Sequence, residues 1–199
     1  MTRDLIAFAI SLTLACTAVT SLAPQASHAA RSRPAGTAAP VADSAAIMAL
    51  LAGVTHGACP LPGVATGGQP GTAHLAALAK AGFTTVLDLR ADDEPRGFDE
   101  AAAMKQNRLR YVKLPVTPAT LDDATFDRFR ALMKGTPGRG VFVHCASGNR
   151  VGATMLPWLV LDRGWDVEQA VASAKAGGLK SAEMEAKARD YIVRHPALR

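Results

Sequence analysis

The chain has 199 residues, of which 49% are hydrophobic and 20% are charged, and it carries a formal net charge of +5. This composition is ordinary for a globular protein, and the length suffices for one domain with a proper hydrophobic core. The mild basicity suits anionic substrates. It does not indicate a nucleic-acid partner, because the cationic residues are scattered among acids and aromatic residues are few.

The N-terminus has the pattern of a secretory signal peptide. An apolar stretch over residues 5–19 follows Arg3, and Ser27-His28-Ala29 places small residues where a signal peptidase reads them. We predict a signal peptide over residues 1–29, which implies a periplasmic or secreted protein with no stable membrane association after cleavage. A retained membrane anchor is disfavoured, since the apolar stretch is short and interrupted by polar residues.

Residues 30–53 are predicted to form a flexible linker, because Ala, Pro, Gly and Ser dominate most of this stretch. The folded domain is then expected over residues 54–199. It begins with a loop-like segment from Cys59 to Pro70, in which one short strand is predicted around Val64.

Strands and helices alternate along the remainder of the chain. Strands are expected at residues 83–89, 111–114 and 141–143. Helices are expected at residues 72–82, 98–107, 121–134 and 149–162 and after residues 166 and 181, with N-caps that include Thr72, Thr120, Asp166 and Ser181. This alternation predicts an α/β fold with a central parallel or mixed sheet of four to five strands flanked by helices. The reactive groups of such sheets lie at the carboxyl ends of the strands.

The strongest chemical pattern lies between Gly140 and Gly152. An apolar strand leads into Cys145, and Ala146, Ser147, Gly148 and Asn149 then separate this cysteine from Arg150. Small residues allow successive backbone N–H groups to converge on one point at the start of the next helix, which creates an anion cradle. We therefore expect Ala146, Ser147, Gly148 and Asn149 to bind the substrate. The same N–H groups and the Arg150 guanidinium favour a nucleophilic thiolate, and the guanidinium can hold two oxygens of a tetrahedral anion.

Two cysteines remain after the predicted loss of Cys16 with the signal peptide. In an oxidising compartment Cys59 and Cys145 could form a disulfide, and Cys59 would then act as a redox lock on the nucleophile. The alternative is that Cys59 is a small residue in a proline-rich entry segment.

The order of several motifs resembles that of bacterial dual-specificity and tyrosine phosphatase-like proteins, including the phosphatase domain of beta-lactamase-hydrolase-like proteins. The motifs are Gly68-Gln69-Pro70, the strand that ends in Asp88-Leu89-Arg90, the strand from Tyr111 to Val116, and the stretch His144-Cys145-Ala146-Ser147-Gly148-Asn149-Arg150. The resemblance extends from Val64 to about Ala176. It implies a cysteine-phosphatase-like fold that acts without a metal ion or other cofactor on a phosphorylated protein or a small anionic substrate. It also implies that Cys145 forms a phosphocysteine, that Arg150 holds the phosphoryl oxygens, and that His144 buttresses the loop.

Three positions depart from the usual phosphatase pattern. Four residues rather than five separate Cys145 from Arg150, Val151 replaces the usual Ser or Thr, and Thr117-Pro118 stands where an aspartic general acid is expected. Four is the spacing of many rhodanese-like sulfurtransferases, so a sulfurtransferase that carries a Cys145 persulfide is one alternative. A catalytically degenerate module that binds an anion or a partner protein is another.

Asp122 and Asp123 are the nearest substitutes for the missing general acid. Both also fall in the first turn of the helix predicted at 121–134, where acids complement the helix dipole. The histidines at positions 56, 74 and 195 are isolated, and no metal-ligand spacing connects them.

Overall fold

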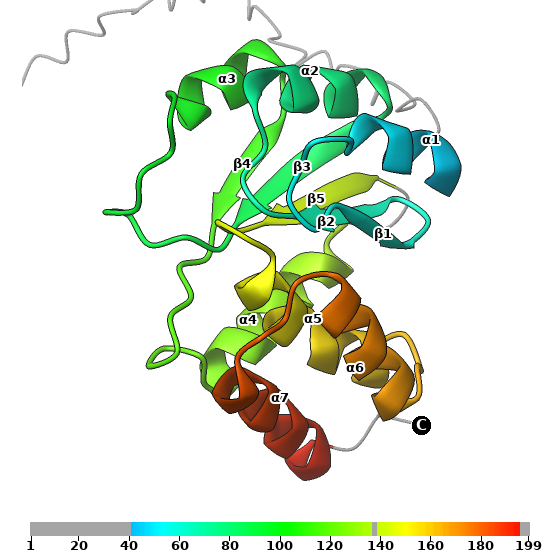
Figure 1. The fold of residues 1–199 in the computed structure, drawn as a ribbon, viewed down its shortest axis with the longest axis vertical. Helices are drawn as coiled ribbons and strands as arrows, with labels where there is room; N and C mark the ends of the chain where they lie inside the picture. The colour runs from blue at the N-terminus through cyan, green and yellow to red at the C-terminus, as the bar shows by residue number, and fades with distance from the viewer. Residues whose placement is uncertain (1–40, 137–138, 196–199) are drawn as a thin grey trace, which may run out of the picture. The chain divides into compact units, whose positions relative to one another are not determined.

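The computed structural model describes residues 41–136 and 139–195. The predicted signal peptide and residues 30–40 of the predicted linker lie outside this part of the chain. The described residues form an α/β arrangement in which a central sheet is covered by helices on both faces (Figure 1). None of the described helices is long and apolar enough to cross a membrane.

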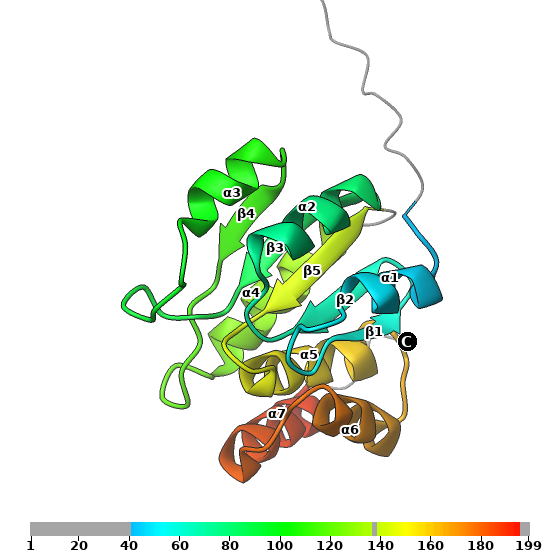
Figure 2. The same ribbon diagram turned by 45° about the horizontal axis from the view of Figure 1, so that its top comes forward.

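The sheet has five strands in the order β1-β2-β5-β3-β4 (Figure 2). Strands β2, β5, β3 and β4 are parallel, and β1 pairs with β2 in the antiparallel direction. The mixed five-stranded sheet confirms the predicted fold class. The strands are β1 (Ala58–Leu61), β2 (Val64–Gly67), β3 (Phe83–Asp88), β4 (Arg110–Lys113) and β5 (Gly140–His144).

The helices divide between the two faces of the sheet (Figure 1). One face carries α1 (Ser44–Leu50), α2 (Thr72–Lys80) and α3 (Glu100–Gln106), and the other carries α4 (Asp123–Lys134), α5 (Asn149–Leu161), α6 (Val167–Ala176) and α7 (Ala182–Arg194). Central strand β5 serves both cores. Val141 and Val143 belong to the core beneath α4 and α5, whereas Phe142 belongs to the core beneath α1 and α2. A strand covered on both faces is therefore apolar at its three central positions, residues 141–143, as its sequence indicates.

Helix α5 is the central helix of its layer, as its apolar sequence predicts. Every residue from Val151 to Leu159 is buried, and the helix packs against α4, α6 and α7. Gly152 permits close contact with α6, because a Cβ there would lie 2.8 Å from both the Ala174 carbonyl oxygen and the Leu179 Cβ. Helix α5 thus begins at the reactive loop and is held firmly by its neighbours.

Two elements were not expected from the sequence. Helix α1 lies in the predicted linker, where Asp43 caps it and Ile47 is fully buried, so order begins before the predicted boundary at residue 54. Strand β1 lies in a segment that was predicted to be a loop. Helix α1 is hard to recognise because the composition around Ile47 is rich in alanine, which obscures its short buried face. Strand β1 is hard to recognise because it is only four residues long and contains Pro60.

Two predicted N-caps are also wrong by one or two residues. The N-cap of α2 is Gly71 rather than Thr72, and that of α4 is Asp122 rather than Thr120. Thr120 instead exchanges hydrogen bonds with Thr117 in the loop before α4. Asp166 and Ser181 cap α6 and α7 as predicted.

Candidate catalytic site

The parallel strands bring the predicted motifs to one edge of the sheet. Gly67 at the end of β2 and Asp88 at the end of β3 both lie beside His144 at the end of β5. Pairing continues past the strands, since the Leu89 amide donates to the His144 carbonyl at 2.9 Å and the Cys145 amide donates to the Gly67 carbonyl at 3.3 Å. Cys145 therefore lies at the carboxyl edge, where open α/β sheets place their sites.

The loop after Cys145 turns back on the sulfur atom. The Gly148 amide donates a hydrogen bond to Cys145 Sγ at 3.1 Å, and the side chain of Cys145 is buried. Gly148 has a φ of +89°, and a Cβ at this position would collide with the Gly177 carbonyl oxygen, so the turn requires glycine. The structure thus forms the predicted turn from a small-residue loop into a helix N-terminus.

Neighbouring segments clamp this loop from outside. His56 Nδ1 lies 2.8 Å from the Ser147 carbonyl oxygen, and Gly68 forms an isolated antiparallel bridge with Ser147. The Gln69 amide also donates to the Ala146 carbonyl at 3.2 Å. These contacts engage the carbonyl groups of Ala146 and Ser147. The loop is therefore held by contacts with its backbone rather than by the packing of bulky side chains.

Arg150 lies in the first turn of α5, and its guanidinium pairs with a carboxylate that the sequence analysis did not single out. Arg150 Nη2 donates to Glu94 Oε2 at 2.6 Å, Nη1 donates to Glu94 Oε1, and Nη1 also donates to the Val116 carbonyl at 3.3 Å. The hydrogen bond with Glu94 raises the pKa of Arg150 despite its burial, and the Cys145 sulfur contributes in the same direction. The guanidinium is therefore held by Glu94 and the Val116 carbonyl at the start of α5.

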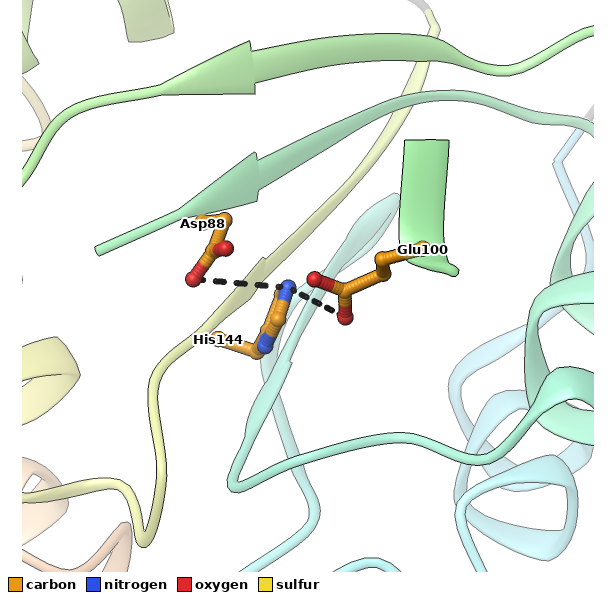
Figure 3. Close-up of side chains that lie close together, drawn as sticks. All are labelled: Asp88, Glu100 and His144. Atoms are coloured by element: carbon orange, nitrogen blue, oxygen red, sulfur yellow. Dashed lines mark ion pairs between the residues drawn. The ribbon is translucent and has the colours of Figure 1, made fainter. Parts of the chain in front are cut away.

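A second group of polar side chains is buried directly behind the reactive loop. Asp88 from β3, Glu100 from α3 and His144 from β5 converge there (Figure 3). Arg90 donates to both Asp88 oxygens at 2.9 Å and also to Glu100, so Asp88 and Arg90 form an ion pair at the end of this strand. Tyr111 lies 2.7 Å from Asp88 Oδ2 and 2.9 Å from Glu100 Oε2.

The pKa values of the side chains in this buried polar group shift in different directions. Burial raises the pKa of Asp88, but hydrogen bonds from Arg90 more than offset this and leave its pKa well below the usual range. Burial raises the pKa of Glu100 and outweighs the attraction of Arg90. Burial lowers the pKa of His144 to about 4, although Asp88 opposes the shift. A neutral imidazole therefore precedes the reactive cysteine at neutral pH.

One ligand atom from each of Asp88, Glu100 and His144 lies within 4.8 Å of the others, which is close enough for a shared metal ion. The Arg90 guanidinium, however, already bridges the two carboxylates and supplies a positive charge between them. Arg96 also lies 3.5 Å from Asp88 Oδ2. The donor set therefore fits a buried ion-pair network better than a cation site.

Asn149 has a role that the sequence analysis did not identify. Its Oδ1 accepts hydrogen bonds from the amides of Lys180 at 2.7 Å and Ser181 at 3.0 Å. The side chain thus ties the start of α5 to the start of α7, in addition to the contact with substrate that is predicted for this position.

The two predicted candidates for a general acid have structural roles. Asp122 caps α4 by accepting a hydrogen bond from the Thr125 amide at 2.9 Å, and Asp123 pairs with Arg194 at 2.5 Å. Their position at the start of a helix, which was the competing interpretation, therefore accounts for both. The acid that pairs with Arg150 is Glu94, and its only sequence signal is its place in a polar loop after a strand end.

The two cysteines among the described residues are free, and they belong to different cores. Cys59 packs against the core beneath α1 and α2, whereas Cys145 belongs to the core beneath α4 and α5. A disulfide cannot bridge opposite faces of the sheet without movement of the backbone. The structure therefore contradicts the pairing that would have made Cys59 a redox lock.

Comparison with known proteins identifies a family and partial relatives. Residues 63–192 match the family described as DSP-PTPase phosphatase fused to NAD+ kinase. Two proteins of Xylella fastidiosa, from strains Temecula1 and 9a5c, are named beta-lactamase hydrolase-like protein and are 33% identical over 91 residues. This stretch is 44% of the present chain and 21% of each relative, so the match spans about a fifth of the relatives' length.

Solved structures share the fold at low sequence identity. A DUF442 protein of Shewanella putrefaciens, named as a phosphatase, has a TM-score of 0.62 and 20% identity over 74% of this chain and 97% of its own. Tk-PTP has a TM-score of 0.61 and 18% identity over 69% and 95%. TpbA of P. aeruginosa has a TM-score of 0.56 and 21% identity over 81% and 92%.

Proposed function

The chain belongs to the family of DSP-PTPase phosphatases, and on this premise we propose that it is a cysteine-dependent phosphoric monoester hydrolase with Cys145 as nucleophile and Arg150 as phosphoryl ligand. The observation that carries the proposal is the hydrogen bond from the Gly148 amide to Cys145 Sγ. It places the sulfur at the base of a helix N-terminus, where amide groups and the helix dipole favour a bound anion.

The reaction divides into two steps. In the first, Cys145 Sγ attacks phosphorus, an S–P bond forms, and the P–O bond to the leaving group breaks. The loop amides and the Arg150 guanidinium stabilise the equatorial oxygens, on which negative charge is spread in the transition state. In the second step water attacks the phosphocysteine, the S–P bond breaks, and inorganic phosphate and free Cys145 result.

A phosphorylated protein or a small phosphate ester is the proposed substrate class. A cysteine-to-serine variant of TpbA, which shares the fold with a TM-score of 0.55, was crystallised in complex with phosphotyrosine. The net charge of +5 favours the approach of anionic substrates in general. Aryl phosphates, including phosphotyrosine, are therefore the first substrates to assay.

The test uses reduced protein and an aryl phosphate. We expect turnover that Cys145→Ser lowers by about a thousandfold or more, because the serine hydroxyl is a far weaker nucleophile at neutral pH. Arg150→Lys should also lower turnover, because an ammonium group cannot hold two oxygens in the bidentate fashion of a guanidinium. Both variants should unfold in urea as the wild type does. Full activity of Cys145→Ser would contradict the assignment of the nucleophile.

A sulfurtransferase is the second candidate, favoured by the four-residue spacing between Cys145 and Arg150. In that reaction Cys145 takes the outer sulfur of thiosulfate, releases sulfite, and passes the sulfur from its persulfide to cyanide as thiocyanate. Turnover of thiosulfate without turnover of any aryl phosphate would reject the phosphatase. Binding of phosphate without turnover of either substrate would support the degenerate anion-binding module.

We also propose that the protein is exported and loses residues 1–29. The support is the apolar stretch over residues 5–19 followed by Ser27-His28-Ala29. Mass spectrometry of the periplasmic protein should find an N-terminus near Ala30 or Arg31. An intact Met1 in that fraction would contradict cleavage.

A further inference from the structure

We propose that Glu94 is the proton donor of the phosphatase reaction and that Arg150 holds its carboxylate in place until substrate binds. The inference rests on the proposed function, since it assigns the acid that the Cys145 chemistry needs. Protonation of the departing oxygen lowers the barrier for leaving groups that are strong bases. The expected aspartate is absent after β4, and Asp122 and Asp123 are engaged at the start of α4.

The position of Glu94 follows from the loop between β3 and α3. This loop leaves the sheet at the carboxyl edge, beside the end of β5, and returns through Gly97, whose φ is +73°. Arg96 donates to the carbonyls of Asp92, Glu94 and Ala91, each at 3.0 Å, so the turn is fixed internally. The Glu94 carboxylate also accepts from the Ala91 amide at 2.7 Å.

Glu94 lies closer to solvent than the other acids near the reactive loop. Its side chain is 27% exposed, and that of Arg150 is 15% exposed, whereas Asp88 and Glu100 are buried behind the loop and bound to Arg90. Among the carboxylates of the described residues, Glu94 is the one that pairs with Arg150. A leaving group points away from Cys145 toward solvent, so the partly exposed Glu94 is the acid placed to reach its oxygen.

The contact with Arg150 gives Glu94 two states. Without substrate, the hydrogen bond from Arg150 lowers the pKa of Glu94, the Ala91 amide and the charge of Arg90 act in the same direction, and partial burial opposes them. A phosphoryl dianion competes for the same guanidinium. Glu94 then loses its partner and faces a like charge, and both changes favour its protonated form.

The proton balance closes over the two steps. Glu94 takes up a proton from solvent when substrate enters and transfers it to the leaving oxygen as the P–O bond breaks. The resulting carboxylate accepts a proton from the water that attacks the phosphocysteine, while the S–P electron pair returns to sulfur. One ester and one water thus become one alcohol and one phosphate, and Glu94 is protonated when the phosphate leaves. Arg150 then pairs with Glu94 again, and the proton taken up at substrate entry returns to solvent.

The experiment compares two leaving groups in the full chain. With phenyl phosphate, whose leaving group is a strong base, we expect Glu94→Gln to lower kcat about a hundredfold, the smaller end of general acid effects. With 2,4-dinitrophenyl phosphate, whose leaving group departs without a proton, the loss should be less than about fivefold. Glu94→Asp keeps a carboxyl group and should recover part of the activity on phenyl phosphate.

Asp93→Asn is the matched control, because it removes an exposed carboxylate from the same loop and should leave both rates unchanged. Equal losses on the two substrates in Glu94→Gln would overturn the inference and leave Glu94 as a positioning residue for Arg150. Unchanged rates would also overturn it. If the wild type hydrolyses neither ester, the proposed function itself fails, and the inference fails with it.

Discussion

Asn149 illustrates how one side chain links the reactive loop to a distant part of the chain. Its Oδ1 accepts hydrogen bonds from the Lys180 and Ser181 amides, which are otherwise unpaired donors at the start of α7. We expect Asn149→Ala to lower the free energy of unfolding by about 1–3 kcal/mol, because two backbone donors lose their acceptor. Urea unfolding should show a lower midpoint at an unchanged slope.

Asn149→Asp is the conservative companion to this variant. It keeps the acceptor and should unfold near the wild type, but its charge beside the anion cradle should raise KM for a phosphate ester. If both variants unfold like the wild type, Oδ1 does not anchor α7. The same result would return Asn149 to the purely substrate-binding role expected from its place in the loop.

At the scale of residues, the chemistry of the loop was predictable and its partners were not. Cys145, Gly148 and Arg150 could be identified because a turn into a helix N-terminus depends on neighbours along the chain. Glu94 pairs with Arg150 from 56 residues away, and this pairing depends on the path of the loop after β3. Sequence spacing carries no information about such a contact. The hydrogen bonds of Asn149 to the start of α7 were unpredictable for the same reason.

At the scale of elements, helix α1 provides the clearest test. Ile47 is fully buried in the core beneath α1 and α2, whereas Met48 on the same helix is 45% exposed. We expect Ile47→Ala to lower the free energy of unfolding by about 2–5 kcal/mol, through lost burial and the cavity that remains. Met48→Ala is the control and should change it by less than about 0.5 kcal/mol. Equal, small effects in urea unfolding would mean that α1 does not pack in solution.

The contrast between predicted and missed elements has a physical basis. The strands β3 and β5 and the helices α4 to α7 carry long apolar patterns, so their existence followed from periodicity. Helix α1 has one fully buried side chain in an alanine-rich stretch, and every residue of β1 is only half-buried, so neither shows a clear apolar pattern. Their stability comes from tertiary packing on the sheet, which local sequence does not encode.

At the scale of the whole molecule, the sheet separates two cores and also buries charge between them. Asp88, Arg90, Glu100 and His144 are each at most 1% exposed, at the point where β3, β5 and α3 meet. Neither ring nitrogen of His144 has a hydrogen-bond partner among the described residues, and its Nε2 lies 3.6 Å from Glu100 Oε1 and 3.9 Å from Asp88 Oδ1. Such a group must affect how the stability of the domain depends on pH.

The pKa of His144, lowered by burial to about 4, predicts the direction of this dependence. An unfolded histidine takes up a proton below about pH 6.5, whereas the folded imidazole stays neutral to about pH 4, so the unfolded state binds more protons in this window. Stability should therefore fall as the pH drops from about 6.5 to 4, by roughly 3 kcal/mol from this residue. The lowered pKa of Asp88 adds a further loss below about pH 4, while the raised pKa of Glu100 opposes both.

The measurement is urea unfolding at a series of pH values, together with the NMR titration of the His144 ring. We expect His144→Gln to be less stable at neutral pH but to lose much of the slope between pH 6.5 and 4, because the substituted side chain does not titrate. His195→Gln changes a partly exposed histidine near Asp123 and should keep the wild-type slope. The expectation would be contradicted if the His144 ring titrates near 6.5, or if His144→Gln keeps the slope of the unfolding free energy between pH 6.5 and 4. Either result would show that the buried polar group admits a proton at little cost, contrary to its position between the two cores.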